Sequence, residues 1–192
     1  MYERLRQLDG ATNVLLAESS IGDNRDFVTS LLRRYQSTPN VLFVTYTRPA
    51  SAYIDQLDEG EPPENAAVIS VGNETPDITD ENVLTESVSS ANDLTCLGIR
   101  MDQFLSRWGD STLVYFDSLT PMLQYVTLRT AYEFVHTITG RIYSNDGKSY
   151  FRIIPDAHDE REIAAFASLF DAKLSPGEEP PVQRRNLPEP LD

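Results

Sequence analysis

Two stretches of the chain carry residue types whose spacing could serve phosphate chemistry. The first covers residues 13–24, with an apolar run at its start and a helical pattern after it. Phosphate-binding loops of pattern G-x-x-x-x-G-K-[ST] lie between a strand and a helix in the same way. Aligned to this pattern, Ala17 takes the first glycine, Gly22 the second, Asp23 the lysine and Asn24 the hydroxyl residue. The frame of a phosphate site is present, but a carboxylate stands where its cation should be.

The second stretch, residues 111–120, is an apolar strand pattern that ends in Asp117. In proteins with a phosphate-binding loop, an acid at the carboxyl end of such a strand holds Mg²⁺. Asp117 is therefore the candidate metal ligand for any magnesium nucleotide that binds. An aspartate at a strand end is also a common turn or helix-capping residue, and the sequence leaves both interpretations open.

The order of four segments, 13–24, 40–49, 113–120 and 150–159, resembles the core of RecA/KaiC-like ATPases. The triplet Asp117-Ser118-Leu119 and the ending Leu169-Phe170-Asp171 are similar to the KaiC side of that superfamily. The resemblance covers roughly residues 12–175. It implies an α/β fold of three layers, with a mainly parallel central sheet flanked by helices, in a domain over residues 1–174. It also implies a KaiC-like protein with a degenerate nucleotide site.

The chain departs from this family at the positions that do the chemistry. In active relatives the second strand usually ends in glutamates that polarise the attacking water, and Thr47 and Arg48 match those positions. Ser19 and Ser20 keep hydroxyls, which suit either a weak nucleotide contact or a helix N-cap. Two unit charges ~4 Å apart interact by about 4 kcal/mol at an effective dielectric near 20, so aspartate in place of lysine weakens phosphate binding by several kcal/mol. We expect no tight Mg-ATP binding, no hydrolysis and no other cofactor.

The composition is strongly acidic. The 192 residues include 30 Asp plus Glu against 16 Lys plus Arg, a formal net charge of −14, and the lysines are Lys148 and Lys173. This balance resembles proteins of halophilic archaea that accumulate salt; an ordinary acidic cytosolic protein is the alternative. The negative field repels nucleic-acid phosphates, so we expect no general nucleic-acid binding.

Other segments and side chains narrow the range of function classes. No signal-peptide pattern and no run of about 18–20 apolar residues occurs, which predicts a cytoplasmic protein without membrane insertion. A single cysteine, Cys96, excludes intramolecular disulfides and is expected to be a buried structural thiol. The two histidines, His136 and His158, have no metal-ligand spacing with it.

Apolar runs alternate with longer helical patterns, which predicts a parallel sheet covered on both faces. Strands are expected at 13–17, 40–46, 66–71, 112–117 and 149–154, and helices at 24–36, 50–58, 93–108, 121–143 and 159–170. Residues 72–92 are predicted to be a long surface loop. Residues 175–192 are acidic, rich in proline and predicted to be a disordered tail.

These observations favour a regulatory or scaffolding pseudo-ATPase that acts through a protein partner or through its own oligomers. A weak NTPase that uses Ser19, Ser20, Gly22 and Asp117 is the enzymatic alternative. A phosphoreceiver-like signalling domain is the second alternative, because it too places an aspartate at a strand end. It would need an acidic pair after the first strand and a lysine at the last strand, whereas this chain offers only Glu18 after the first strand and, at the last strand, Arg152 and no lysine.

Overall fold

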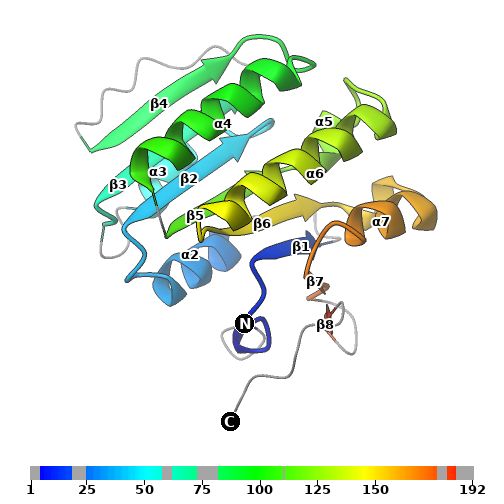
Figure 1. The fold of residues 1–192 in the computed structure, drawn as a ribbon, viewed down its shortest axis with the longest axis horizontal. Coiled ribbons are helices and arrows are strands. Elements are labelled where there is room, and N and C mark those ends of the chain that lie inside the picture. Colours follow the sequence, from blue (N-terminus) through cyan, green and yellow to red (C-terminus); the bar gives the residue numbers. More distant parts are fainter. Residues whose placement is uncertain are drawn as a thin grey trace.

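The computed structural model describes residues 5–18, 25–57, 62–72, 82–109, 111–176 and 181–184. Within these residues most strands are followed by a helix, and the exceptions are β3, which is followed by β4, and β7, which is followed by β8 (Figure 1). The strands are β1 (Asn13–Ala17), β2 (Asn40–Thr45), β3 (Asn65–Val71), β4 (Val83–Val88), β5 (Thr112–Asp117), β6 (Lys148–Ile153), β7 (Ala172–Leu174) and β8 (Val182–Arg184). The helices are α2 (Arg25–Arg34), α3 (Ser51–Leu57), α4 (Leu94–Trp108), α5 (Leu119–Met122), α6 (Leu128–Ser144) and α7 (Glu160–Ala167), with a 3₁₀ turn at Pro155–Ala157.

The described strands form one sheet of eight, in the order β4-β3-β2-β5-β6-β1-β7-β8. Strands β1 to β7 run parallel, and β8 is antiparallel to β7. Strand β6 lies between β1 and β5, so the first strand and the strand that ends in Asp117 are second neighbours. The doubly wound order 2-1-3-4-5 of phosphoreceiver domains places the first two strands side by side, which this sheet does not. The strand order therefore contradicts the phosphoreceiver alternative.

Helices cover both faces of the sheet, as expected for parallel strands whose sequences are continuous apolar runs. One face packs against α4, α5, α6 and α7 in a core that contains Leu15, Phe116 and Phe151. The other face packs against α2, α3 and the turn before β1, in a core that contains Phe43 and Tyr115. In Figure 1, α4 and α6 cross the near face of the sheet. The three-layer α/β class predicted from the sequence is confirmed.

Three predicted elements need correction. Residues 72–92, expected to be a surface loop, include β4, which pairs in parallel with β3 at the sheet edge. The single helix expected at 121–143 is two helices, because Thr127 accepts a hydrogen bond from the backbone N–H of Thr130 and starts α6 anew. The disordered tail expected from residue 175 is wrong for Val182–Arg184, where β8 pairs with β7 and the Arg184 guanidinium donates to the carbonyl of Gln7.

No described helix is long and apolar enough to cross a bilayer. The side chain of Cys96 is half-buried on α4 rather than fully enclosed. His136 is exposed on α6, and His158 contacts the Thr120 hydroxyl at 3.0 Å through Nε2. The described residues contain no group of three or more His, Cys, Asp and Glu side chains placed to hold a metal ion.

Candidate functional site

Polar side chains follow one row across the sheet, near the carboxyl ends of the strands. Thr45 of β2 is in register with Ser70 of β3 on one side and with Asp117 of β5 on the other. The next strand, β6, contributes Arg152, which is in register with Leu16 of β1. Because side chains alternate between the faces of a strand, Asp117 and Arg152 lie on the face covered by α2 and α3, as do Tyr115 and Tyr150 two residues earlier.

Asp117 is fully buried, and both of its carboxylate oxygens have hydrogen-bond donors from this chain. Oδ1 accepts from Arg152 Nη1 at 3.0 Å, and Oδ2 accepts from the Tyr53 hydroxyl of α3 at 2.7 Å. The Arg152 residue is 8% exposed. A buried carboxylate needs such a partner, because an unpaired charge in a protein interior is strongly unfavourable. Asp117 is thus held in an internal ion pair.

Glu18 places a second carboxylate beside the same guanidinium. Its Oε2 atom lies 3.5 Å from Arg152 Nε, immediately after β1. Arg152 therefore stands between the acid that follows the first strand and the acid that ends β5. One cation of this chain serves two acids at the carboxyl edge of the sheet.

The electrostatic surroundings keep this cluster in its hydrogen-bonded form. Burial is the largest single influence and acts against a charged guanidinium, but the Asp117 carboxylate, Tyr115 and Glu18 together outweigh it and raise the pKa of Arg152 above its ordinary value. Burial, together with the Asp117 charge, raises the pKa of Tyr53 well above its ordinary range. Arg152 stays cationic, and the Tyr53 hydroxyl keeps the proton that it donates to Asp117.

These contacts decide whether Asp117 fits a magnesium ion. A carboxylate that binds Mg²⁺, directly or through its waters, must turn an oxygen toward the ion. Here both oxygens point to donors, and a guanidinium occupies the neighbourhood where a cation would compensate the acid. The donor set at Asp117 therefore does not fit Mg²⁺ in this arrangement.

The other predicted site residues that the structure describes lie at the ends of β1, β2 and β5 or in the turns that follow these strands. Ala17 ends β1 and is buried, and Ser118 is buried as the N-cap residue of α5. Thr47 is exposed and Arg48 half-buried in the turn after β2. The Thr45 hydroxyl closes that turn, since it donates to the Arg48 carbonyl and accepts from the Arg48 N–H, both at 3.0 Å. Ser19, Ser20, Gly22, Asp23 and Asn24 lie outside the described residues.

Sequence reasoning missed Arg152 and Tyr53 as partners of Asp117. One local signal was available, because Arg152 interrupts the apolar strand pattern Tyr150-Phe151-Arg152-Ile153. A charge inside a buried strand requires a partner, and the acid at the end of another central strand was the natural candidate. Tyr53 gave no such signal, since tyrosine is common in helices that pack on a sheet.

The chain was compared with known proteins. It matches, over residues 11–175, the family described as "Family of unknown function (DUF7504)". The chain belongs to this family. The DUF7504 match spans the strands from β1 to β7 and so contains the whole ion-pair cluster. No curated protein matches the sequence.

Two solved structures share the fold of this DUF7504 chain. One, titled a structural study of Project ID PH0250 from Pyrococcus horikoshii OT3, has 14% identity and a TM-score of 0.64, covering 93% of this chain and 88% of its own. The other is the flagellar accessory protein FlaH from Methanocaldococcus jannaschii, with 10% identity and a TM-score of 0.56, covering 85% of this chain and 70% of its own. At such identities the likeness shows the fold alone, and that fold is RecA-like.

Alkaline pH tests the role of Tyr53. A tyrosine whose pKa is raised in the folded state contributes stability that is fully present below its unfolded value of 10.0 and is lost as pH rises beyond it. Each such group contributes at most about 1.4 kcal/mol per pH unit to the fall in the free energy of unfolding. Burial also raises the pKa of Tyr46 and Tyr150, so the intact chain should lose stability steeply above this pH.

The Tyr53→Phe variant should lose about 1.5–3 kcal/mol at neutral pH, where the hydrogen bond to a carboxylate is missing. Above pH 10 its decline should be shallower than that of the intact chain. Urea unfolding between about pH 8 and pH 11 measures both slopes. Parallel slopes would show that Tyr53 does not hold its proton for Asp117.

Proposed function

We propose that this chain is a regulatory or scaffolding pseudo-ATPase of the KaiC-like branch of RecA-like proteins, which acts by protein association in the cytoplasm of a halophilic archaeon. The observation that carries the proposal is the internal ion pair. Arg152 and Tyr53 engage both oxygens of Asp117, the acid that would otherwise serve a magnesium nucleotide. The residues of the loop after β1 add to this, because Asp23 and Asn24 replace a lysine and a hydroxyl residue.

The ion pair also allows the fold to be stable without bound nucleotide or ATP turnover. A cation from the chain itself neutralises the buried acid, so the carboxyl edge is stable without a nucleotide. FlaH, which shares the fold, is named an accessory protein. By analogy, a RecA-like domain that does not hydrolyse ATP can still offer surfaces to a partner or to a second copy.

Nucleotide titration in salt tests the proposal. In about 2 M KCl, which screens repulsion between exposed charges, calorimetry should show no saturable Mg-ATP binding at micromolar concentrations, and phosphate release should stay at background. A dissociation constant weaker than about 1 mM corresponds to less than about 4 kcal/mol of binding free energy. Saturable micromolar binding, or turnover that Asp117→Ala abolishes, would show an NTPase.

A restored loop provides the matched comparison. The double variant Asp23→Lys, Asn24→Ser recovers the charge and the hydroxyl that the phosphate-binding pattern requires. Because Asp117 remains paired with Arg152, we expect this variant to stay without turnover. Turnover in the double variant would show that the ion pair does not block the site and that the loop alone is degenerate.

A further inference from the structure

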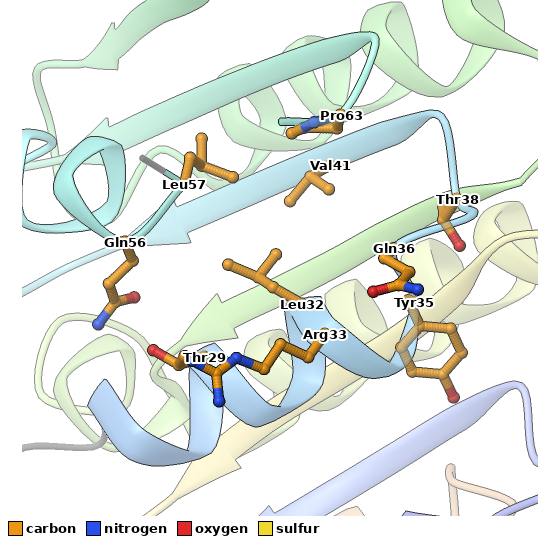
Figure 2. A pocket seen from close by; sticks show the side chains of 10 residues that line it. All are labelled: Thr29, Leu32, Arg33, Tyr35, Gln36, Thr38, Val41, Gln56, Leu57 and Pro63. Atoms are coloured by element: carbon orange, nitrogen blue, oxygen red, sulfur yellow. The ribbon is translucent and has the colours of Figure 1, made fainter. Parts of the chain in front are cut away.

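A groove runs between α2 and α3, over β2, on the sheet face that also carries the ion pair (Figure 2). Its empty space is about 480 Å³, including the part open to solvent. Ten side chains line it: Thr29, Leu32, Arg33, Tyr35, Gln36, Thr38, Val41, Gln56, Leu57 and Pro63.

The groove has an apolar middle and polar side chains at both ends, and we call the end that contains Arg33 the polar end. Figure 2 shows Leu32 and Leu57 in the middle, one from each helix, and Thr29, Arg33 and Gln56 together at one end. Such an arrangement suits a ligand that has an apolar body and a polar head. The apolar body excludes water from the middle, while the head determines orientation.

The polar end contains a buried hydrogen-bond acceptor, the side-chain oxygen of Gln56, that has no donor. The residue is 2% exposed, and its Oε1 atom has no hydrogen-bond partner. The Thr29 hydroxyl, which lines the same groove, is also buried without a partner. A buried acceptor without a donor is unfavourable, so a ligand N–H that reaches Gln56 gains more than the same contact in water would give.

Arg33 supplies the charge at the same end. It is exposed on α2, and it is the one charged residue among the ten lining residues. No described acid forms a salt bridge with it, whereas the next residue, Arg34, pairs with Asp9. An arginine without a described acidic partner beside an apolar groove favours a ligand with a carboxylate. The net charge of −14 acts against an anionic ligand, and moderate salt screens that repulsion.

We propose that this groove captures the C-terminus of a partner polypeptide that ends in an apolar residue. The terminal carboxylate binds Arg33, the last backbone N–H donates to Gln56 Oε1, and the apolar side chain fills the space between Leu32 and Leu57. Capture of a terminal carboxylate beside a pocket for the last side chain is a general mode of peptide recognition. The proposal rests on the proposed function, since a docking groove serves a protein that acts by association.

A short probe peptide tests the groove directly. The tripeptide acetyl-Ala-Ala-Leu with a free carboxylate should bind in the sub-millimolar range, as expected for a ligand of about 20 heavy atoms at about 0.3 kcal/mol per atom. The same peptide with a C-terminal amide should bind at least tenfold more weakly. Titrations followed by amide and methyl chemical shifts in moderate KCl give the affinity and the place of binding, where Leu32 and Leu57 should shift most.

Two variants and one control measure separately how much Arg33 and Gln56 contribute to peptide affinity. Arg33→Gln should weaken the carboxylate peptide about tenfold and leave the amide peptide unchanged, while Gln56→Met should weaken both severalfold. Arg107→Gln, an exposed arginine on α4 at the opposite sheet face, should change neither. Thermal melts confirm that each variant is folded.

Several outcomes would overturn the proposal. They are equal affinity for the acid and amide peptides, an Arg33→Gln effect no larger than that of Arg107→Gln, shifts away from the groove, or no binding at about 10 mM peptide. Binding of N-acetyl-leucine as tight as that of the tripeptide would identify a small-metabolite site instead. The peptide titration is independent of the Mg-ATP titration, so a groove that binds no peptide leaves the pseudo-ATPase proposal standing. Mg-ATP turnover would overturn the pseudo-ATPase proposal, and the peptide titration would still report separately on the groove.

Discussion

Replacing Arg152 with methionine is expected to lower the free energy of unfolding by about 3–5 kcal/mol, because it leaves the buried Asp117 carboxylate without its cation. Asp117 is fully buried and the Arg152 side chain is 10% exposed, so water cannot take over the pairing without rearrangement. For a chain of this length, about 1 kcal/mol shifts the melting temperature by roughly 2–4 °C, so a fall of about 10 °C should follow. Urea unfolding of both proteins in the same KCl concentration measures the difference.

A double variant identifies the cause. Adding Asp117→Leu to Arg152→Met removes both charges, and it should recover a large part of the lost stability, since a buried ion pair is often replaceable by apolar residues of similar size. The matched control is Arg129→Met, whose salt bridge with Glu133 lies on the exposed surface of α6 and should contribute less than about 1 kcal/mol. A loss below about 1 kcal/mol for Arg152→Met, or no recovery in the double variant, would mean that Asp117 does not depend on the pair.

The strands were predictable from the sequence where both of their faces are buried, because burial then requires a run of apolar residues. Strands β1, β2, β3, β5 and β6 are covered on both faces, so apolar runs mark them. Strand β4 lies at the sheet edge and contains Thr85-Glu86-Ser87, because Glu86 is paired with Arg100 of α4 instead of being enclosed. Its pattern is therefore that of a polar loop. The three-residue strands β7 and β8 are too short for any periodicity to appear.

The site was predictable only in part, because its defining contacts are not local in sequence. Asp117 was identified from the strand that it ends, which is a local pattern. Its partners come from α3 and from β6, 64 and 35 residues away, and their contacts depend on a strand order that no local pattern specifies. The placement of Asp23 and Asn24 at the lysine and hydroxyl positions of the phosphate-binding pattern rests on the sequence alone, and both residues lie outside the described part of the chain. The internal cation had to come from the structure.

Stability is expected to rise with salt, by roughly 10 °C in melting temperature between dilute buffer and about 2 M KCl if screening recovers about 3 kcal/mol. At a net charge of −14 the folded chain brings acids closer together than the unfolded chain does, and added salt screens their repulsion. The internal pair of Asp117 and Arg152 is buried and should respond little to salt. Thermal melts over a KCl series measure the trend, and a melting temperature that stays flat or falls would contradict the halophilic interpretation.

Charge removal distinguishes screening from a general effect of concentrated solutes. Asp55, Glu64 and Asp156 are exposed, and no salt bridge joins them to other described residues. The variant Asp55→Asn, Glu64→Gln, Asp156→Asn removes three negative charges without touching the core, so it should melt above the intact chain in dilute buffer and show a shallower rise with KCl. At molar salt the two curves should converge, because the repulsion that separates them is then screened. Equal slopes would mean that KCl acts by strengthening apolar burial, as excluded solutes do, and not by relieving the acidic surface.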